Sequence, residues 1–255
     1  MTVHVPSRRG PVLLTLCILF GTASCNLVKE DRRACPCALN VDVSGLPAYP
    51  VQLALRAGDF QEQRTAARDT TFRVMAPKSG VLLVAVSGTA LPEGEVISIP
   101  PGFDCPPLYL QSEWVETAAD TARVRVQLHK HFCTLSLTVT GPPGWGEPYW
   151  TEIRGRVGGL TLEGEPREGS FLCRLDSGSA IRLPRQDPEG ELWLDITMPD
   201  CVVRSFALGH YMLEAGYDWT APDLEDLPLQ LDLSVTAISF RMGNWSTVIP
   251  LDVEI

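Results

Sequence analysis

The alternation of apolar and polar side chains along most of this chain limits the folds that it can adopt. Within residues 122–141, Val124, Val126 and Leu128 alternate with polar residues, and a second alternating run follows at residues 135–139. A period of two residues places apolar side chains on one face of a β-strand and polar ones on the other. The region is longer than an ordinary strand, so we expect it to break near residues 129–132.

Further strands are expected throughout the chain, and no run has a sustained helical period. Residues 80–88 form a continuous apolar run between glycines, which is typical of a strand covered on both faces. Other strand-like segments are residues 51–55, 95–100, 153–157, 170–175, 180–183, 192–197, 229–235, 237–242 and 246–255. Turn signals recur at the spacing seen in β-sandwiches. The 255 residues therefore predict an all-β protein with two antiparallel β-sandwiches in tandem.

The N-terminus predicts an exported lipoprotein. Arg8 and Arg9 precede an apolar run, residues 11–21, that is too short to span a bilayer and has the length of a signal peptide. Small residues then lead to Cys25, whose thiol is the expected site of lipid attachment. The alternative is an ordinary signal peptide cut near Ser24, with Cys25 in a disulfide.

Polar and turn-rich segments divide the chain into four predicted parts. Residues 1–24 are a signal peptide, and residues 25–37 are a lipidated tether. The stretch at residues 141–148 is rich in Gly and Pro and marks a domain boundary. We expect an N-terminal sandwich over residues 38–142 and a C-terminal sandwich over residues 143–255.

Six cysteines follow the predicted lipid site, and an even number in an exported chain predicts disulfides. The disulfide candidates are Cys35, Cys37, Cys105, Cys133, Cys173 and Cys201. The sequence does not fix their connectivity. Cys173 and Cys201 both fall in the second half of the chain and are the favoured pair.

The chain offers little catalytic or metal chemistry. It has no nucleophile-elbow, metalloprotease or phosphate-loop motif. Cys35 and Cys37, taken with His129 and His131, lack the two-residue gap of a zinc site, and the acidic residues 218–226 lack the central Gly of a calcium loop. We therefore expect no catalytic residue, metal, cofactor or small-molecule substrate. The net charge of -10 argues against a nucleic-acid partner.

The order of short motifs along the chain resembles one family of surface proteins. The motifs are Cys25, Glu30-Asp31, Cys35-Pro36, Leu208-Gly209-His210-Tyr211, Gly216-Tyr217-Asp218-Trp219, Asp223-Leu224-Glu225-Asp226, Leu229-Gln230-Leu231-Asp232 and Trp245. In combination they resemble the FimB-type fimbrial anchor subunits, the minor fimbrium anchoring lipoproteins. Two features depart from that pattern: Thr22 stands where a larger aliphatic residue is usual, and cysteines are more numerous.

The resemblance implies two tandem transthyretin-like antiparallel β-sandwich domains behind a lipoprotein signal peptide. It also implies a non-enzymatic subunit, tethered to the outer membrane and exposed at the cell surface, that anchors a fimbrium and limits its length. Its partners would be fimbrial shaft subunits, joined by β-strand exchange. A donated strand supplies the hydrogen-bond partners that an open sheet edge lacks.

The last predicted strand, residues 246–255, is the leading candidate for strand exchange with a neighbouring subunit. The side chains that would take part are Val248, Ile249, Leu251 and Val253. The competing interpretation is that this segment is simply the last strand of the second sandwich.

Two other functions remain open at the level of sequence. A surface glycan-binding lipoprotein would use exposed aromatic side chains, with Trp145, Tyr149, Trp150 and Trp219 as candidates. Three of these would have to lie on one exposed face. A tip or accessory adhesive subunit of the same fimbrium is the other alternative, and nothing in the sequence separates it from an anchor.

Overall fold

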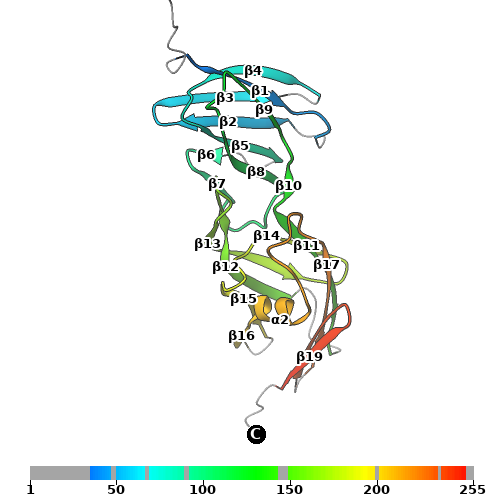
Figure 1. Ribbon diagram of the computed structural model, residues 1–255. Helices are drawn as coiled ribbons and strands as arrows, with labels where there is room; N and C mark the ends of the chain where they lie inside the picture. Colours follow the sequence, from blue (N-terminus) through cyan, green and yellow to red (C-terminus); the bar gives the residue numbers. More distant parts are fainter. Residues whose placement is uncertain are drawn as a thin grey trace, which may run out of the picture.

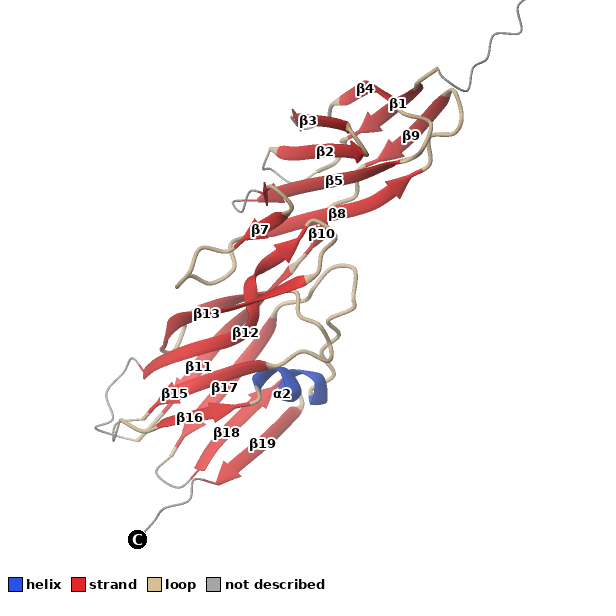
Figure 2. Cartoon of the chain, turned by 90° about the vertical axis from the view of Figure 1, so that its left-hand side faces the viewer, coloured by secondary structure: helices blue, strands red, loops and turns tan. Residues whose placement is uncertain are grey.

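Four β-sheets form two sandwiches that follow each other along the molecule (Figure 1, Figure 2). The structure is a computed structural model. The residues that it describes are 35–46, 50–66, 69–88, 92–142, 149–198, 201–234 and 237–250. Nearly all of them belong to strands or their connecting turns, so the predicted all-β class is confirmed. The predicted signal peptide and Cys25 lie outside the described residues.

The first sandwich packs a three-stranded sheet, sheet A, against a five-stranded sheet, sheet B. Sheet A has the order β4-β1-β9, made of β4 (Thr71–Ala76), β1 (Cys37–Asp42) and β9 (Thr121–Arg125). Sheet B has the order β10-β8-β5-β2-β3, made of β10 (His129–Lys130), β8 (Leu108–Val115), β5 (Val81–Gly88), β2 (Val51–Ala57) and β3 (Phe60–Ala66). Leu39 and Val41 of sheet A pack against Leu53, Leu55 and Leu83 of sheet B. The alternation predicted at residues 51–55 is therefore confirmed.

The second sandwich is formed by sheets C and D. Sheet C has the order β16-β15-β12-β7-β6, with β13 also paired to β12, and consists of β16 (Val203–Phe206), β15 (Leu192–Thr197), β12 (Tyr149–Thr161), β7 (Val96–Ser98), β6 (Pro92–Glu93) and β13 (Pro166–Leu175). Sheet D has the order β14-β11-β17-β18-β19, made of β14 (Ala180–Pro184), β11 (Phe132–Thr140), β17 (Leu227–Leu233), β18 (Ala237–Met242) and β19 (Trp245–Pro250). The break expected near residues 129–132 is present, between β10 and β11.

The two sandwiches repeat one strand arrangement, which is transthyretin-like. In each, the first strand pairs antiparallel with the fourth strand, as β1 does with β4 and β11 with β14. Counting only the strands of each sandwich, and so leaving out β6 and β7 in the first, the first strand also pairs in parallel with the seventh. These pairs are β1 with β9 and β11 with β17. The predicted sandwiches are thus antiparallel except for one parallel pair in each. A parallel pair needs a long crossover, and here the rest of the sandwich supplies it.

The strand pairing divides the chain earlier than the boundary predicted after residue 142. β11 falls within the range expected for the N-terminal sandwich, yet it is an interior strand of sheet D, between β14 and β17. β6 and β7 also come from the first half of the chain and extend sheet C through pairing with β12. Whether residue 142 ends an independently folding unit stays a prediction.

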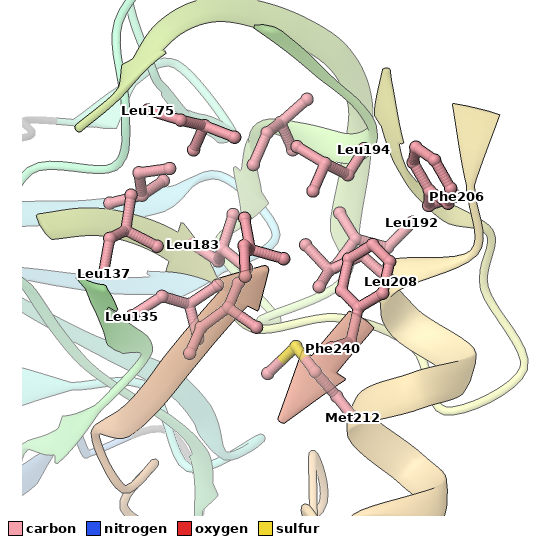
Figure 3. Packing of buried hydrophobic residues seen from close by; sticks show 14 of the residues in the cluster. Leu135, Leu137, Leu175, Leu183, Leu192, Leu194, Phe206, Leu208, Met212 and Phe240 are labelled. Atoms are coloured by element: carbon pink, nitrogen blue, oxygen red, sulfur yellow. The ribbon is translucent and has the colours of Figure 1, made fainter. Parts of the chain in front are cut away.

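The two sheets of the second sandwich pack on either side of one apolar layer. Leu135, Leu137 and Leu183 of sheet D face Leu175 and Leu194 of sheet C (Figure 3). The helix α2 (Leu208–Glu214) closes the gap beside β16, where its Leu208 and Met212 are fully buried. A fully buried Leu or Met contributes roughly 1.5–3 kcal/mol through the hydrophobic effect. This two-turn helix was not predicted from the sequence.

A second apolar layer joins the two sandwiches. Val84 and Val86 of β5 pack with Ile97 of β7 and with Leu160 and Leu162 at the end of β12. The other face of β5 packs in the core of the first sandwich. The apolar run at residues 80–88 is therefore covered on both faces, as predicted.

Glycines let β12 pair with two different strands along one edge. Its residues 151–155 pair with β15, and its residues 159–161 pair with β7. On the other edge of β12, the register of its pairing with β13 shifts between Gly155 and Gly159. The φ angles of these two glycines are 138° and 134°. A Cβ atom at Gly159 would lie 2.2 Å from the carbonyl oxygen of Ile97. Only glycine tolerates both the backbone conformation and this close approach.

Candidate functional site

The hairpin of β18 and β19 forms the far edge of sheet D. Its two-residue loop is Gly243-Asn244, and Gly243 has a φ of 57° that favours glycine. The loop sets a register in which Met242 pairs with Trp245 and Ile238 pairs with Ile249. The strand predicted at residues 246–255 is present as β19, and the structure describes it to Pro250.

The side chains of β19 alternate between the core and solvent. Trp245 stacks on Tyr211 of α2 with ring centroids 5.7 Å apart, and Ile249 packs against the core of the second sandwich. Val248 points to the opposite side and is 63% exposed. β19 is thus held to the sandwich by one face and by its pairing with β18.

The outer backbone edge of β19 is open. Among the described residues, no strand pairs with β19 on the side away from β18. The opposite edge of sheet D is covered, because the N–H of Cys105 donates to the carbonyl of Arg182 on β14 and the N–H of Arg182 donates to the Asp104 carboxylate. Proteins usually cover or shorten such edges because unpaired backbone groups attract other strands. Sheet D therefore presents one protected edge and one edge that can accept a strand.

The predicted strand-exchange residues divide into two groups. Val248 and Ile249 lie on β19, with Val248 exposed and Ile249 half-buried. Leu251 and Val253 lie outside the described residues. Their participation in strand exchange stays a prediction.

A polar clasp fixes the segment that passes from the first sandwich to the second. We call it the junction clasp, and it brings His129, Lys130 and His131 against Arg185 and Asp223. The Asp223 carboxylate accepts from the Lys130 N–H at 2.7 Å and lies 3.3 Å from His129 Nδ1. Arg185 Nε donates to His131 Nδ1 at 3.1 Å. The acidic residues 218–226, which lack the central Gly of a calcium loop, thus supply this contact, which the sequence did not predict.

Two shifted pKa values set the charge states of the junction clasp near pH 7. Burial, followed by the charge of Arg185, lowers the pKa of His131 to about 4. Its imidazole is therefore neutral near pH 7 and accepts the hydrogen bond from Arg185. The hydrogen bond from the Lys130 N–H lowers the pKa of Asp223, which holds that carboxylate in its charged form.

All six candidate cysteines are free thiols in the structure. Cys35 and Cys201 are exposed, whereas Cys37, Cys105, Cys133 and Cys173 are buried or partly so. The favoured pairing of Cys173 with Cys201 is absent. Cys173 lies on β13, which pairs with one edge of β12 at Thr151, whereas Cys201 follows β15, which pairs with the other edge of β12 at the same residue. β12 therefore separates β13 from β15.

The aromatic candidates for glycan binding do not gather on one surface. Tyr149 and Trp219 are only 5% and 2% exposed, and they belong to the core of the second sandwich. Trp150 is 58% exposed, and Trp145 lies outside the described residues. Within the part of the chain that the structure describes, the required group of three on one exposed face is not present.

The described residues also hold no cluster of three His, Cys, Asp or Glu side chains arranged to bind a metal ion. Cys37 lies in sheet A, whereas His129 and His131 lie at the junction of the sandwiches, so the structure does not bring the cysteine pair and the histidines together. No helix within the described residues is long and apolar enough to cross a bilayer.

Comparison with known proteins identifies the fold. No protein-family model and no curated protein matches the chain. Among solved structures, the fimbrial anchor protein Mfa2 from Porphyromonas gingivalis matches with a TM-score of 0.60 and 12% identity, over 83% of this chain and 99% of Mfa2. A candidate adhesin from Bacteroides ovatus matches with a TM-score of 0.59 and 13% identity, over 84% of this chain and 95% of that protein.

A candidate adhesin from Bacteroides thetaiotaomicron matches with a TM-score of 0.53 and 12% identity, over 84% of this chain and 98% of that protein. Each likeness extends over both sandwiches rather than over one of them. The resemblance to fimbrial anchor subunits is therefore confirmed at the level of the fold. This chain has the tandem-sandwich fold of the fimbrial anchor protein Mfa2.

Proposed function

We propose that the protein is a non-enzymatic, lipid-tethered anchor subunit. It attaches a fimbrium to the outer membrane, limits the length of the fimbrium and joins a shaft subunit by β-strand exchange. Cys25 carries the lipid, and the open edge of β19 is where the strand of a neighbouring subunit pairs. The likeness to the fold of a fimbrial anchor protein supports this assignment.

The observation that carries the proposal is the separation of two features along the molecule. β1 begins at Cys37, so the chain from Cys25 enters the fold at sheet A. β19 lies at the opposite end of the elongated molecule (Figure 1, Figure 2). A subunit that links a membrane to a filament needs its membrane attachment and its docking edge at different ends.

The anchoring role is tested by replacing the lipid-bearing thiol. Cys25→Ser should move the protein from the membrane fraction to the soluble fraction and shed fimbriae into the medium. Cys201→Ser is the matched control, because it removes a different thiol, one that is exposed in the second sandwich. Cell-attached and shed fimbriae are counted for both variants. Fimbriae that stay attached with Cys25→Ser would contradict anchoring and favour an accessory adhesive subunit.

The docking edge is tested by substituting one exposed residue of β19. Val248→Lys should leave the free energy of unfolding within about 0.5 kcal/mol, because the side chain is 63% exposed. A lysine on an edge strand opposes the approach of another strand, so we expect the shaft to be lost while the lipoprotein stays in the membrane.

Val203→Lys is the control for the docking test. Val203 is 58% exposed and lies on β16, the edge strand of sheet C. Retention of the shaft with Val203→Lys and its loss with Val248→Lys would place docking at β19. Equal effects of the two substitutions, or no effect of Val248→Lys, would contradict that position.

A further inference from the structure

Three arginines lie on the outer face of sheet A, in a chain whose net charge is -10. The strand alternation that buries Leu39 and Val41 turns Arg73 of β4 and Arg123 and Arg125 of β9 to solvent. The register places Arg73 and Arg123 on either side of Asn40, which sits on β1 between them. The three guanidinium groups therefore share one exposed sheet face.

Within the strands of sheet A, this face carries more positive than negative charge. Among the described residues, no carboxylate forms an ion pair with Arg73, Arg123 or Arg125. Asp42 is the single carboxylate in the sequence of β1, β4 and β9, and it accepts a hydrogen bond from the Ser44 N–H at 3.0 Å. Three arginines against one aspartate leave a local charge of about +2, opposite in sign to the chain as a whole.

The outer face of sheet A lies at the end of the molecule where the chain enters the fold. One face of sheet B packs on sheet A, and the other face packs on β7 and the end of β12. The outer face of sheet A therefore points away from the second sandwich, and it lies at the end opposite β19 (Figure 1). Cys25 precedes Cys37, the first residue of β1, by 12 positions, so the lipid site lies within about 43 Å of sheet A along the chain.

We propose that the outer face of sheet A docks on a phosphate-bearing lipid surface. Arginine is suited to this partner because its planar guanidinium donates two hydrogen bonds to a phosphate group and stays charged. The proposal rests on the proposed function in one respect, that a lipid on Cys25 keeps the face close to the membrane. Tethering then raises the local concentration of the face at the headgroups.

Docking of this face would set the direction of the molecule on the membrane. With sheet A against the headgroups, the two sandwiches extend away from the bilayer and the open edge of β19 faces outward. A lipid on Cys25 alone would limit the distance between the protein and the membrane, but it would not fix the orientation of the protein. The three arginines therefore act as an orienting surface, and exposed Met75, on the same face of β4, lies beside them.

The test uses the mature full-length chain with Cys25→Ser, so that no lipid contributes to binding. Sedimentation with phosphatidylcholine vesicles, with and without phosphatidylglycerol, measures the partition coefficient. We expect a clear preference for the anionic vesicles that weakens with added salt. Arg123→Gln with Arg125→Gln should lower binding about 25-fold, since each arginine near an anionic surface contributes about fivefold. The matched control is Arg167→Gln with Arg241→Gln, two exposed arginines of the second sandwich.

Four outcomes decide the proposal. Loss of binding with the sheet A variant and not with the control supports it. Equal binding to neutral and anionic vesicles, or equal binding by the two double variants, overturns it. Competition by inorganic phosphate at low concentration would assign the face to a soluble anion and also overturn it. Because the lipid is absent from this assay, its result is independent of the Cys25→Ser fractionation experiment.

Discussion

At the scale of single residues, His131 makes the stability of the fold sensitive to acid. Burial lowers its pKa in the folded protein to about 4, from an ordinary value of 6.5. Between these values the unfolded chain binds a proton that the folded chain does not, so stability is lost as the pH falls through this window. We expect the free energy of unfolding to decrease by up to about 3 kcal/mol from this group.

Denaturant unfolding between about pH 7 and about pH 4 measures this loss. His131→Gln should flatten the pH dependence, since the amide does not titrate and still offers an oxygen to Arg185. His210→Gln is the control substitution, because it removes an exposed imidazole whose Nε2 lies 3.1 Å from Glu214 at the surface. An equally steep decrease in the His131→Gln variant would show that carboxylates such as Asp223 dominate.

The thiols should fall into two classes of reactivity. Burial raises the pKa of Cys133 and of Cys173 to about 11, which keeps both protonated near neutral pH, and protonated thiols react slowly. In the mature chain with Cys25→Ser, we expect fast labelling of Cys35 and Cys201 by a disulfide reagent at pH 8, and slow labelling of the other four. Fewer than six thiols after full denaturation would show that disulfides form in the protein.

At the scale of elements, the bend of β12 decides how the two sandwiches connect. Gly159 lets residues 159–161 leave β15 and pair with β7, because its backbone has positive φ and approaches Ile97 closely. Gly159→Ala should cost at least about 2 kcal/mol of stability in thermal or denaturant unfolding, since the methyl group meets backbone atoms.

Gly178→Ala is the control for the β12 bend. Gly178 has a φ of 85°, but a Cβ atom added there would have no other atom within 4 Å, so this substitution tests backbone strain alone. Its cost should be about 1 kcal/mol. Similar costs at Gly159 and Gly178 would mean that the close approach to β7 is relieved by a small shift.

At the scale of the whole molecule, β11 decides where the chain can be divided. β11 is an interior strand of sheet D, paired on both sides, and buries Leu135 and Leu137 in the second core. A fragment of residues 143–255 lacks this strand and should show no cooperative thermal transition. A fragment of residues 132–255 retains it and should unfold cooperatively, as followed by circular dichroism at about 218 nm, the usual β-sheet region. Cooperative unfolding of the shorter fragment would support the boundary predicted at residue 142.

The sequence by itself determined which segments are strands and which of their faces are buried. Val51, Leu53 and Leu55 are buried as their alternation predicts, and the apolar run at residues 80–88 is covered on both faces. These features are local, because the two-residue period fixes the side of the sheet on which each residue lies. The predicted signal peptide and the predicted lipid site at Cys25 likewise rest on the sequence alone.

The helix α2 was within reach of the sequence but was missed. Leu208 and Met212 are four residues apart and both fully buried, which is the spacing of one helical face. Two turns are too few to produce a sustained period, and strand-like segments surround them. Packing of Tyr211 against Phe240 and Trp245 stabilises the helix in the fold.

Only the tertiary structure decided which strands are neighbours and which edges stay open. β11 joins strands more than 40 residues further along the chain, and no local pattern specifies that choice. The junction clasp joins residues that are 93 and 94 positions apart in the sequence. Arg73 and Arg123 share one sheet face because their strands pair with the two edges of β1. Such contacts depend on the order of strands in a sheet, which follows from how whole apolar faces are buried together. The open edge of β19 and the basic face of sheet A are consequences of that order.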